Sequence, residues 1–239
     1  LKILQPFREL ERERGTGDDR LLREVARALA LNMAYEDGIR VAQQKIQAER
    51  FARIRREAGI RESQVVEIAD FFHPRTEEIA DILPVPLGNA LKNWRWARRL
   101  SDRLSRGGRI VRTSTIRGYL FLYFLAALKP LRRRSLRFKH VQADLAKWIE
   151  TVLHMAANDY ELAVEFAKCR NLVKGYGETH ARTGARFEAI AGLAPALLGK
   201  PDAAATLREL REAALQDETG QALTLAIAGL ERKKRTARS

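Results

Sequence analysis

A long run of apolar residues at helical spacing constrains the fold of this chain more than any other feature. Its members recur in steps of three and four residues, which places them on one face of an α-helix. They are Phe138, Val141, Leu145, Trp148, Ile149, Val152, Met155 and Ala156. We therefore predict a helix of about five turns with one buried side. Asn158 and Asp159 then offer a cap for a second helix, which should end at Gly175.

The composition also favours helices. The 239 residues are 46% hydrophobic and 31% charged, with only 15 Gly and 7 Pro, a balance typical of helical proteins with a buried core. We predict an all-α fold: an irregular multi-helix bundle with long amphipathic helices and no significant sheet. Because the chain begins at Leu1, we expect a C-terminal fragment of a longer subunit that forms a single helical domain over residues 1–239. The basic stretch 231–239 lacks an apolar face and is predicted to be a frayed tail.

Two further segments give local predictions. The acids Asp18 and Asp19 precede a periodic apolar run, so a helix should begin there and continue to about Gly59, or bend at Gly38. Residues 110–115 are rich in β-branched side chains. We predict a short extended connection there rather than a strand in a sheet, because no partner strand is visible elsewhere.

The most apolar stretch, residues 119–128, is too short to cross a membrane. It has ten residues, whereas a membrane-spanning helix needs about 20. We predict a core helix instead, in which aromatic side chains supply much of the central packing. These aromatic residues are Tyr119, Phe121, Tyr123 and Phe124.

The net positive charge of the chain is concentrated in residues 91–139. This segment holds 15 Lys or Arg against one acid, Asp102, while the remaining residues hold 29 basic and 29 acidic side chains. Such a local surplus favours an anionic partner, and a solvated helical face is the alternative. The basic residues that we expect to contact a partner are Arg95, Arg99, Arg132, Arg133 and Arg134.

No motif for catalysis, cofactor binding or metal binding is present. One cysteine cannot provide the ligand set of an iron–sulfur cluster, and the four histidines lack the paired spacing of zinc sites. We therefore predict no catalytic, cofactor-binding or metal-binding residue in this chain. The cysteine, Cys169, lies in an apolar run, and we expect a buried free thiol in a reducing cytoplasm.

Residues 175–180 are the best remaining candidate for a ligand site. Two glycines there place flexible backbone beside the side chains of Tyr176, Glu178 and His180, which could contact a ligand. The alternative is a joint between helices, with one helix ending at Gly175 and the next beginning near Thr179.

Several short motifs give the chain a resemblance to a known family. They are Asn32-Met33-Ala34-Tyr35-Glu36-Asp37, Leu83-Pro84-Val85-Pro86-Leu87-Gly88, Lys147-Trp148-Ile149-Glu150, Ala156-Ala157-Asn158-Asp159-Tyr160 and Leu172-Val173-Lys174-Gly175-Tyr176-Gly177-Glu178-Thr179-His180. Together they resemble the C-terminal helical domain of indolepyruvate ferredoxin oxidoreductase subunits, over most of residues 20–193.

This resemblance implies a smaller subunit in which an N-terminal γ-type domain of the 2-oxoacid oxidoreductase family precedes the helical domain. Complexes of this family oxidatively decarboxylate aryl pyruvates with thiamine diphosphate and iron–sulfur clusters, using coenzyme A and ferredoxin. The chain would be a non-catalytic assembly domain that binds no cofactor itself and docks on the γ-type domain and the large thiamine-dependent subunit. Its basic segment would then attract ferredoxin or coenzyme A, and no membrane partner is expected.

A nucleic-acid-binding helical module is the alternative function. The formal net charge is +14, and Trp94 and Trp96 lie among the arginines of the basic segment, where indole rings can stack on bases. Nucleic acid is the less favoured partner, because the resemblance implies protein partners.

Overall fold

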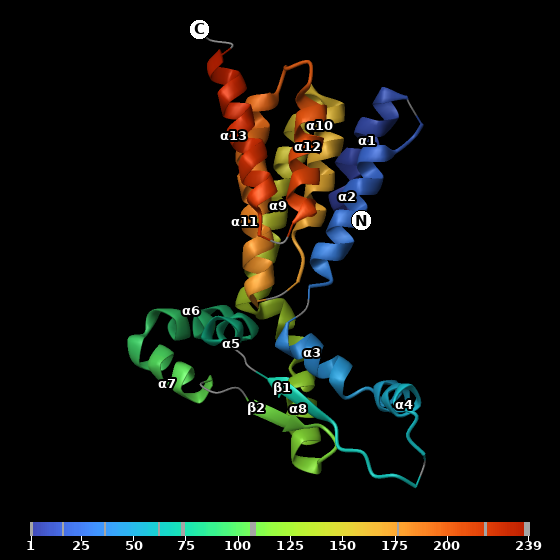
Figure 1. Ribbon diagram of the computed structural model, residues 1–239, viewed down its shortest axis with the longest axis vertical. Helices are drawn as coiled ribbons and strands as arrows, with labels where there is room; N and C mark the ends of the chain where they lie inside the picture. The colour runs from blue at the N-terminus through green and yellow to red at the C-terminus, as the bar shows by residue number, and fades with distance from the viewer. Residues whose placement is uncertain are drawn as a thin grey trace. The chain divides into compact units, whose positions relative to one another are not determined.

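The computed structural model divides the chain into two compact units. The described residues are 2–15, 17–35, 37–61, 63–72, 75–105, 109–175, 177–217 and 219–236. The terminal unit consists of residues 1–35 and 144–239, and the central unit consists of residues 36–143. Helices dominate both units (Figure 1), which confirms the predicted all-α fold. That the two units form a single domain stays a prediction.

The terminal unit is a bundle of helices drawn from both ends of the chain. Its α-helices are α1 (Gln5–Arg14), α2 (Arg20–Met33), α9 (Leu136–Asn158, from residue 144 onward), α10 (Tyr160–Cys169), α11 (Gly177–Leu193), α12 (Ala203–Gln216) and α13 (Gln221–Thr236). Its short 3-10 helices are η1 (Lys2–Leu4), η3 (Arg170–Leu172) and η4 (Ala194–Leu197). The stretch predicted to be a frayed tail is helical as far as Thr236, and residues 237–239 lie outside the described residues.

Helix α10 lies at the centre of the terminal unit, beside α2 and α12 (Figure 1). Leu162 and Phe166 are fully buried, as expected for a helix that is apolar around its circumference. The helix starts where the sequence predicts, because the Asp159 carboxylate accepts a hydrogen bond from the Leu162 N–H at 3.0 Å. It ends at Cys169 rather than at Gly175, and η3 follows it.

Helix α9 confirms the strongest prediction from the sequence. It runs unbroken for 23 residues, and most of the predicted apolar face is buried in the terminal unit, while Phe138, Val141 and Ile149 are half-buried. The fully buried members of that face are Leu145, Trp148, Val152, Met155 and Ala156. A local pattern at helical spacing was therefore sufficient to find both the helix and the side that it packs.

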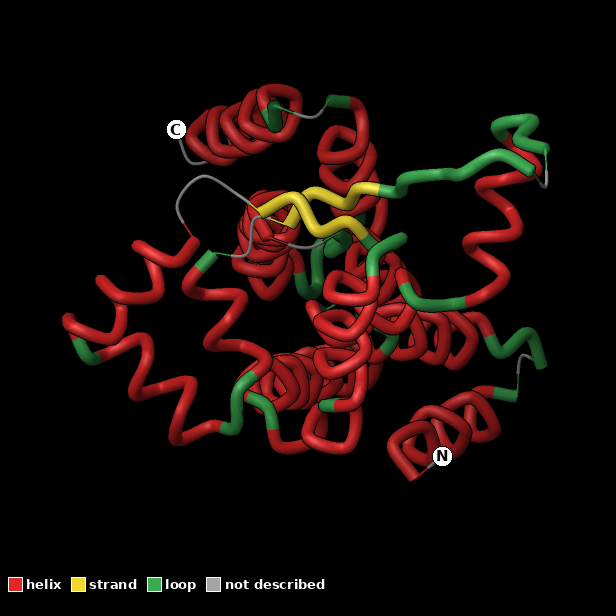
Figure 2. The backbone as a smooth tube through the Cα atoms, turned by 90° about the horizontal axis from the view of Figure 1, so that it is seen from below, coloured by secondary structure: helices red, strands yellow, loops and turns green. Residues whose placement is uncertain are grey.

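The central unit combines short helices with a two-stranded antiparallel ribbon (Figure 2). Its elements are α3 (Gly38–Lys45), α4 (Ala48–Glu57), β1 (Ala69–Phe72), α5 (Thr76–Ile82), α6 (Val85–Asn93), α7 (Arg95–Ser105), β2 (Arg109–Arg112), α8 (Ile116–Ala127) and η2 (Lys129–Arg134). The strand register runs from Ala69 opposite Arg112 to Phe72 opposite Arg109.

Two local predictions are wrong in this region. The continuous helix expected from Asp18 to about Gly59 is divided into α2, α3 and α4, and α3 begins at Gly38, where a bend was the predicted alternative. The division arises because Asp37 caps a new helix by accepting a hydrogen bond from the Arg40 N–H at 2.7 Å. Residues 110–115 include the strand β2, whose partner was missed because β1 has only four residues and the acid Asp70 interrupts its apolar run.

Helix α8 is also placed differently from the prediction. The segment is helical as expected, but its aromatic side chains do not form the core. Only Leu122 and Ala126 are buried, against Ala42 and Ile46 of the α3 region. The aromatic residues are 38%, 52%, 52% and 66% exposed at Tyr119, Phe121, Tyr123 and Phe124. One narrow strip of α8 therefore packs on the unit, and the aromatic side chains lie outside it.

The start of α8 is held against β2 by a close backbone approach at Gly118. The Thr115 hydroxyl donates to the Arg112 carbonyl at 2.7 Å and accepts from the Gly118 N–H at 3.2 Å. A Cβ atom at Gly118 would lie 2.1 Å from the same Arg112 carbonyl oxygen. Only glycine fits this position without a backbone shift.

Gly118→Ala should therefore destabilise the protein. We expect the free energy of unfolding to fall by about 1–3 kcal/mol, because the added methyl group must displace the end of β2. Urea unfolding followed by circular dichroism measures the change. Gly184→Ala in α11 is the matched control, since its Cβ would meet nothing within 4 Å and alanine favours a helix by about 1 kcal/mol. Equal stabilities of the two variants would contradict the close approach.

Candidate functional site

The excess positive charge belongs to the central unit. Residues 36–143 hold 23 Lys and Arg against 11 Asp and Glu, a net charge of +12, while the terminal unit holds 21 against 19, a net charge of +2. Any partner recognised by charge would therefore be attracted mainly to the central unit.

Part of this charge is neutralised inside the unit by acids that precede the basic segment. Arg132 Nε pairs with Asp37 Oδ2 at 2.7 Å, and the Asp37 side chain is 6% exposed. Lys92 Nζ pairs with Asp81 Oδ1 at 2.9 Å. The Asp70 carboxylate pairs with Lys45 Nζ and accepts two hydrogen bonds from Arg50 Nη2, each at 3.0 Å. These pairs join β1, α3, α4 and η2 to one another, and α5 to α6.

The predicted contact residues are divided by these pairs. Arg132 is engaged with Asp37, whereas Arg133 and Arg134 are exposed on η2. Neither of the latter two pairs with an acid among the described residues. Neighbouring arginines in one run thus take different roles, and the partner contacts predicted for Arg133 and Arg134 stay predictions.

Arg95 and Arg99 line an open hollow beside two exposed indoles. Trp94 and Trp96 are 56% and 64% exposed, and their ring centroids lie 5.8 Å apart with 29° between the planes. Together with Asn93 these residues line a volume of about 670 Å³. Stacked rings beside two guanidinium groups can hold a planar or anionic group.

Gly175 lies in the joint between η3 and α11, and residues 177–180 form the first turn of α11. Gly175 has a φ of +79°, and α11 begins at Gly177, two residues earlier than expected. The buried Thr183 hydroxyl donates to the Lys174 carbonyl at 2.9 Å and ties the joint to α11. Of the predicted ligand contacts, Glu178 is exposed and His180 is half-buried. Tyr176 lies outside the described residues, and ligand binding at these positions stays a prediction.

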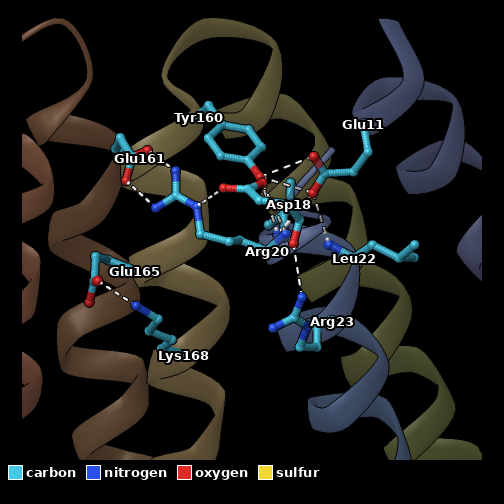
Figure 3. Close-up of polar contacts among 10 residues, drawn as sticks. Glu11, Asp18, Arg20, Leu22, Arg23, Tyr160, Glu161, Glu165 and Lys168 are labelled. Atoms are coloured by element: carbon cyan, nitrogen blue, oxygen red, sulfur yellow. Dashed lines mark hydrogen bonds and ion pairs between the residues drawn. The ribbon is translucent and has the colours of Figure 1, made fainter. Parts of the chain in front are cut away.

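The structure also reveals a buried polar network that the sequence did not indicate (Figure 3). The Glu11 carboxylate is 4% exposed and accepts hydrogen bonds from the Tyr160 hydroxyl at 2.9 Å and from the Leu21 and Leu22 N–H groups at 2.9 and 3.2 Å. Glu11 and Tyr160 are 149 positions apart. No local pattern in the sequence could have shown that they meet.

Glu11 replaces the missing N-terminal cap of α2. Asp19, the residue at the cap position, has a left-handed φ of 44° and makes no capping hydrogen bond with its side chain. Glu11 supplies the acceptor from α1 instead. Nearby, Arg20 pairs with Asp18 at 2.6 Å and with Glu161 of α10 (Figure 3). The network therefore fixes α1, α2 and α10 against one another.

The same network keeps the Tyr160 hydroxyl protonated. Burial, together with the hydrogen bond to Glu11, raises the pKa of Tyr160 to about 12. The Arg14 guanidinium lies 4.1 Å from the centre of the Tyr160 ring. A phenol with a raised pKa is a poor base at neutral pH, and Glu11 already has hydrogen-bond donors. These groups are suited to a structural role.

A second buried carboxylate joins α10 to α12. The Glu165 side chain is 3% exposed and receives Lys168 Nζ at 2.8 Å, with Arg208 and Arg211 each at 3.4 Å. Figure 3 shows the Lys168 contact. Glu165 holds α12 against the centre of the unit, because three cations converge on one buried acid.

Cys169 is a buried free thiol, as predicted. Burial raises its pKa to about 12, so the thiolate that ligates an iron–sulfur cluster is disfavoured. The chain has no second cysteine. Its residues therefore do not fit an iron–sulfur cluster.

These observations define a helical protein with internally paired buried acids and a strongly cationic central unit. A family of unknown function, DUF6537, matches residues 1–192, and the chain belongs to that family. No curated protein and no solved structure matches the chain. Within the described ranges, no cluster of three or more His, Cys, Asp or Glu side chains could hold a metal ion. Across that part of the chain, every helix is too short or too polar to cross a membrane.

Glu11→Gln should weaken the terminal unit. We expect the free energy of unfolding to fall by about 1.5–3 kcal/mol, because a charged acceptor of several hydrogen bonds becomes neutral. Glu9→Gln on the same helix, where the exposed side chain accepts a hydrogen bond from Gln5, should change it by less than about 0.5 kcal/mol. Urea unfolding compares the two variants. A similar loss in both would show that Glu11 does not cap α2.

Tyr160 should make the stability depend on alkaline pH. Its pKa is raised from 10.0 to about 12 on folding, so its contribution is fully present below pH 10 and is lost as the pH rises toward 12. Between those values, the free energy of unfolding of the wild type should fall more steeply than that of Tyr160→Phe, by up to about 1.4 kcal/mol per pH unit. Urea unfolding at several alkaline pH values measures both slopes, and equal slopes would contradict the prediction.

Proposed function

We propose that this chain is a non-catalytic assembly domain of an indolepyruvate ferredoxin oxidoreductase subunit that acts in the cytoplasm. Two lines of support combine here: the resemblance of its motifs to that family, and the roles that the motif residues take in the structure. The observation that carries the proposal is that these residues hold helices against one another. That is the work of a scaffold.

The motif residues contact other elements of their own unit. Asn32 Oδ1 accepts a hydrogen bond from Arg170 Nε at 3.2 Å, and the Arg170 side chain is buried. Gly88 packs so closely on α5 that a Cβ there would lie 2.5 Å from the Ala80 carbonyl oxygen. Tyr160 completes the network at Glu11 described above. The motifs therefore fix the fold at points far apart in the sequence.

In this proposal the chemistry is carried by other polypeptide. Thiamine diphosphate and the iron–sulfur clusters belong to the large subunit, where aryl pyruvates are oxidatively decarboxylated, and the γ-type domain belongs to the same subunit as this chain. The net charge of the central unit supports contact with acidic ferredoxin or the phosphates of coenzyme A. The exposed arginines that could make it are Arg95, Arg99, Arg133 and Arg134.

The complex of the large subunit with the complete smaller subunit tests this proposal. Arg133→Glu combined with Arg134→Glu should raise the apparent KM for ferredoxin or coenzyme A by about tenfold at low ionic strength, with little change in kcat, because salt-sensitive attraction is reversed. The control, Arg8→Glu with Arg12→Glu in α1, makes the same change of charge in the terminal unit. It should leave both KM values within about twofold.

Three results would overturn the proposal: ferredoxin reduction by the isolated chain with indolepyruvate, failure to co-purify with the large subunit, or tight oligonucleotide binding. The last would favour the nucleic-acid-binding alternative, which the exposed stack of Trp94 and Trp96 supports. A titration of tryptophan fluorescence with a mixed-sequence oligonucleotide measures it. We expect no binding at physiological salt, whereas affinity that falls steeply with salt is the signature of phosphate recognition.

A further inference from the structure

Helix α8 carries an apolar surface that nothing in the described part of the central unit covers. From Gly118 to Leu128 the chain has no charged residue. Ile116, Leu120, Tyr123 and Phe124 are 80%, 44%, 52% and 66% exposed. At about 100° per residue, Leu120 and Phe124 lie opposite the buried strip of Leu122 and Ala126, and Ile116 and Tyr123 lie on the adjoining flank. We call this set of four residues the α8 ridge.

The α8 ridge continues into a hollow at the start of the helix. Ile116 and Leu120 line it together with Phe51 of α4, Tyr119 and residues 113–115, around a volume of about 450 Å³. Tyr119 and Tyr123 stack nearby with ring centroids 6.4 Å apart. A ridge beside a hollow can fit a complementary surface, and a contiguous exposed apolar patch is a feature of interaction sites.

The ends of the α8 ridge are cationic. Arg117 lies at its start, and Lys129, Arg133 and Arg134 follow its end, all four exposed. None of them pairs with an acid among the described residues. The sequence contains no acid from Arg103 to Ala143. The apolar surface therefore has a rim of one sign of charge.

We propose that the α8 ridge docks into an apolar groove of a partner protein whose rim carries Asp and Glu. Aromatic residues with arginine are the side chains enriched at protein interfaces, and a cationic rim selects an acidic counterpart. A second copy of this chain is disfavoured, because it would bring the same basic residues together. The inference goes beyond the proposed function in naming the surface, and it rests on that function only for the identity of the partner.

Site-specific photo-crosslinking in cells that produce the full chain tests the docking surface. Benzoylphenylalanine replaces Phe124 in one variant and Leu225 of α13, which is 73% exposed, in the control. We expect an adduct with another protein at position 124 only, and its crosslinked peptide should combine apolar residues with Asp or Glu within about one helical turn. Both positions are exposed, so the melting temperature should stay within about 3 °C of the wild type.

A photo-crosslinker at a second position of the α8 ridge, Leu120, then tests the apolar contact and the charge separately. With the photo-crosslinker at Leu120, adding Phe124→Glu should lower the adduct yield by about tenfold or more. Reversal of the rim by Arg133→Glu with Arg134→Glu should do the same, whereas Arg8→Glu with Arg12→Glu should not.

Three other outcomes overturn the inference. An adduct with a second copy of this chain would make the surface a self-association site. If the chain binds vesicles of phosphatidylcholine and phosphatidylglycerol and Phe124→Glu abolishes this binding, the α8 ridge contacts a lipid surface instead of a protein. An adduct yield at Phe124 no higher than that of the Leu225 control would show that the α8 ridge has no protein partner. If the captured protein has the stated chemistry but is not a subunit of the oxidoreductase, the proposed function fails and the docking surface stands.

Discussion

The fold depends on carboxylates that are buried and fully paired. Glu11, Asp37, Asp70 and Glu165 all lie out of water, where an unpaired charge is very unfavourable. Each meets donors or cations from another element: Glu11 the N–H groups at the start of α2, Asp37 a cation of η2, Asp70 cations of α3 and α4, and Glu165 cations of α12. A misplaced helix would leave such a buried charge without its partner. These acids therefore specify which helices pack against one another.

The same pairing determines which basic residues remain for a partner. Arg132 and Arg133 are neighbours in sequence, yet the first completes a pair with the buried Asp37 and the second faces solvent. A count of charges along the basic segment cannot separate them, since the acids that neutralise Lys92 and Arg132 come from before residue 91. The positive charge that a partner can meet is the part not paired with acids on folding. It is smaller than the charge of the basic segment.

Local patterns predicted what depends on neighbours in sequence. The buried face of α9 and the cap at Asp159 follow from spacing and residue type alone. The network at Glu11 and the pairing of β1 with β2 join distant segments and left no local signal. Of the predicted site residues, the structure brings Arg95 and Arg99 together beside the indoles, and it engages Arg132 elsewhere. The prediction that α8 is a core helix failed for another reason. Hydropathy shows that its aromatic side chains are apolar, but it does not show whether the same unit can cover them.

An exposed apolar helix needs a reason not to associate with itself, and the charges around α8 provide one. Two copies meeting through the α8 ridge would bring Arg117, Lys129 and Arg133 near their own counterparts, with no acid in the sequence from 103 to 143 to separate them. Like charges at close range oppose that contact. A partner with acidic residues turns the same charges into attraction. The cationic rim therefore discriminates between wrong and right occupants of one apolar surface, while the apolar area supplies the affinity.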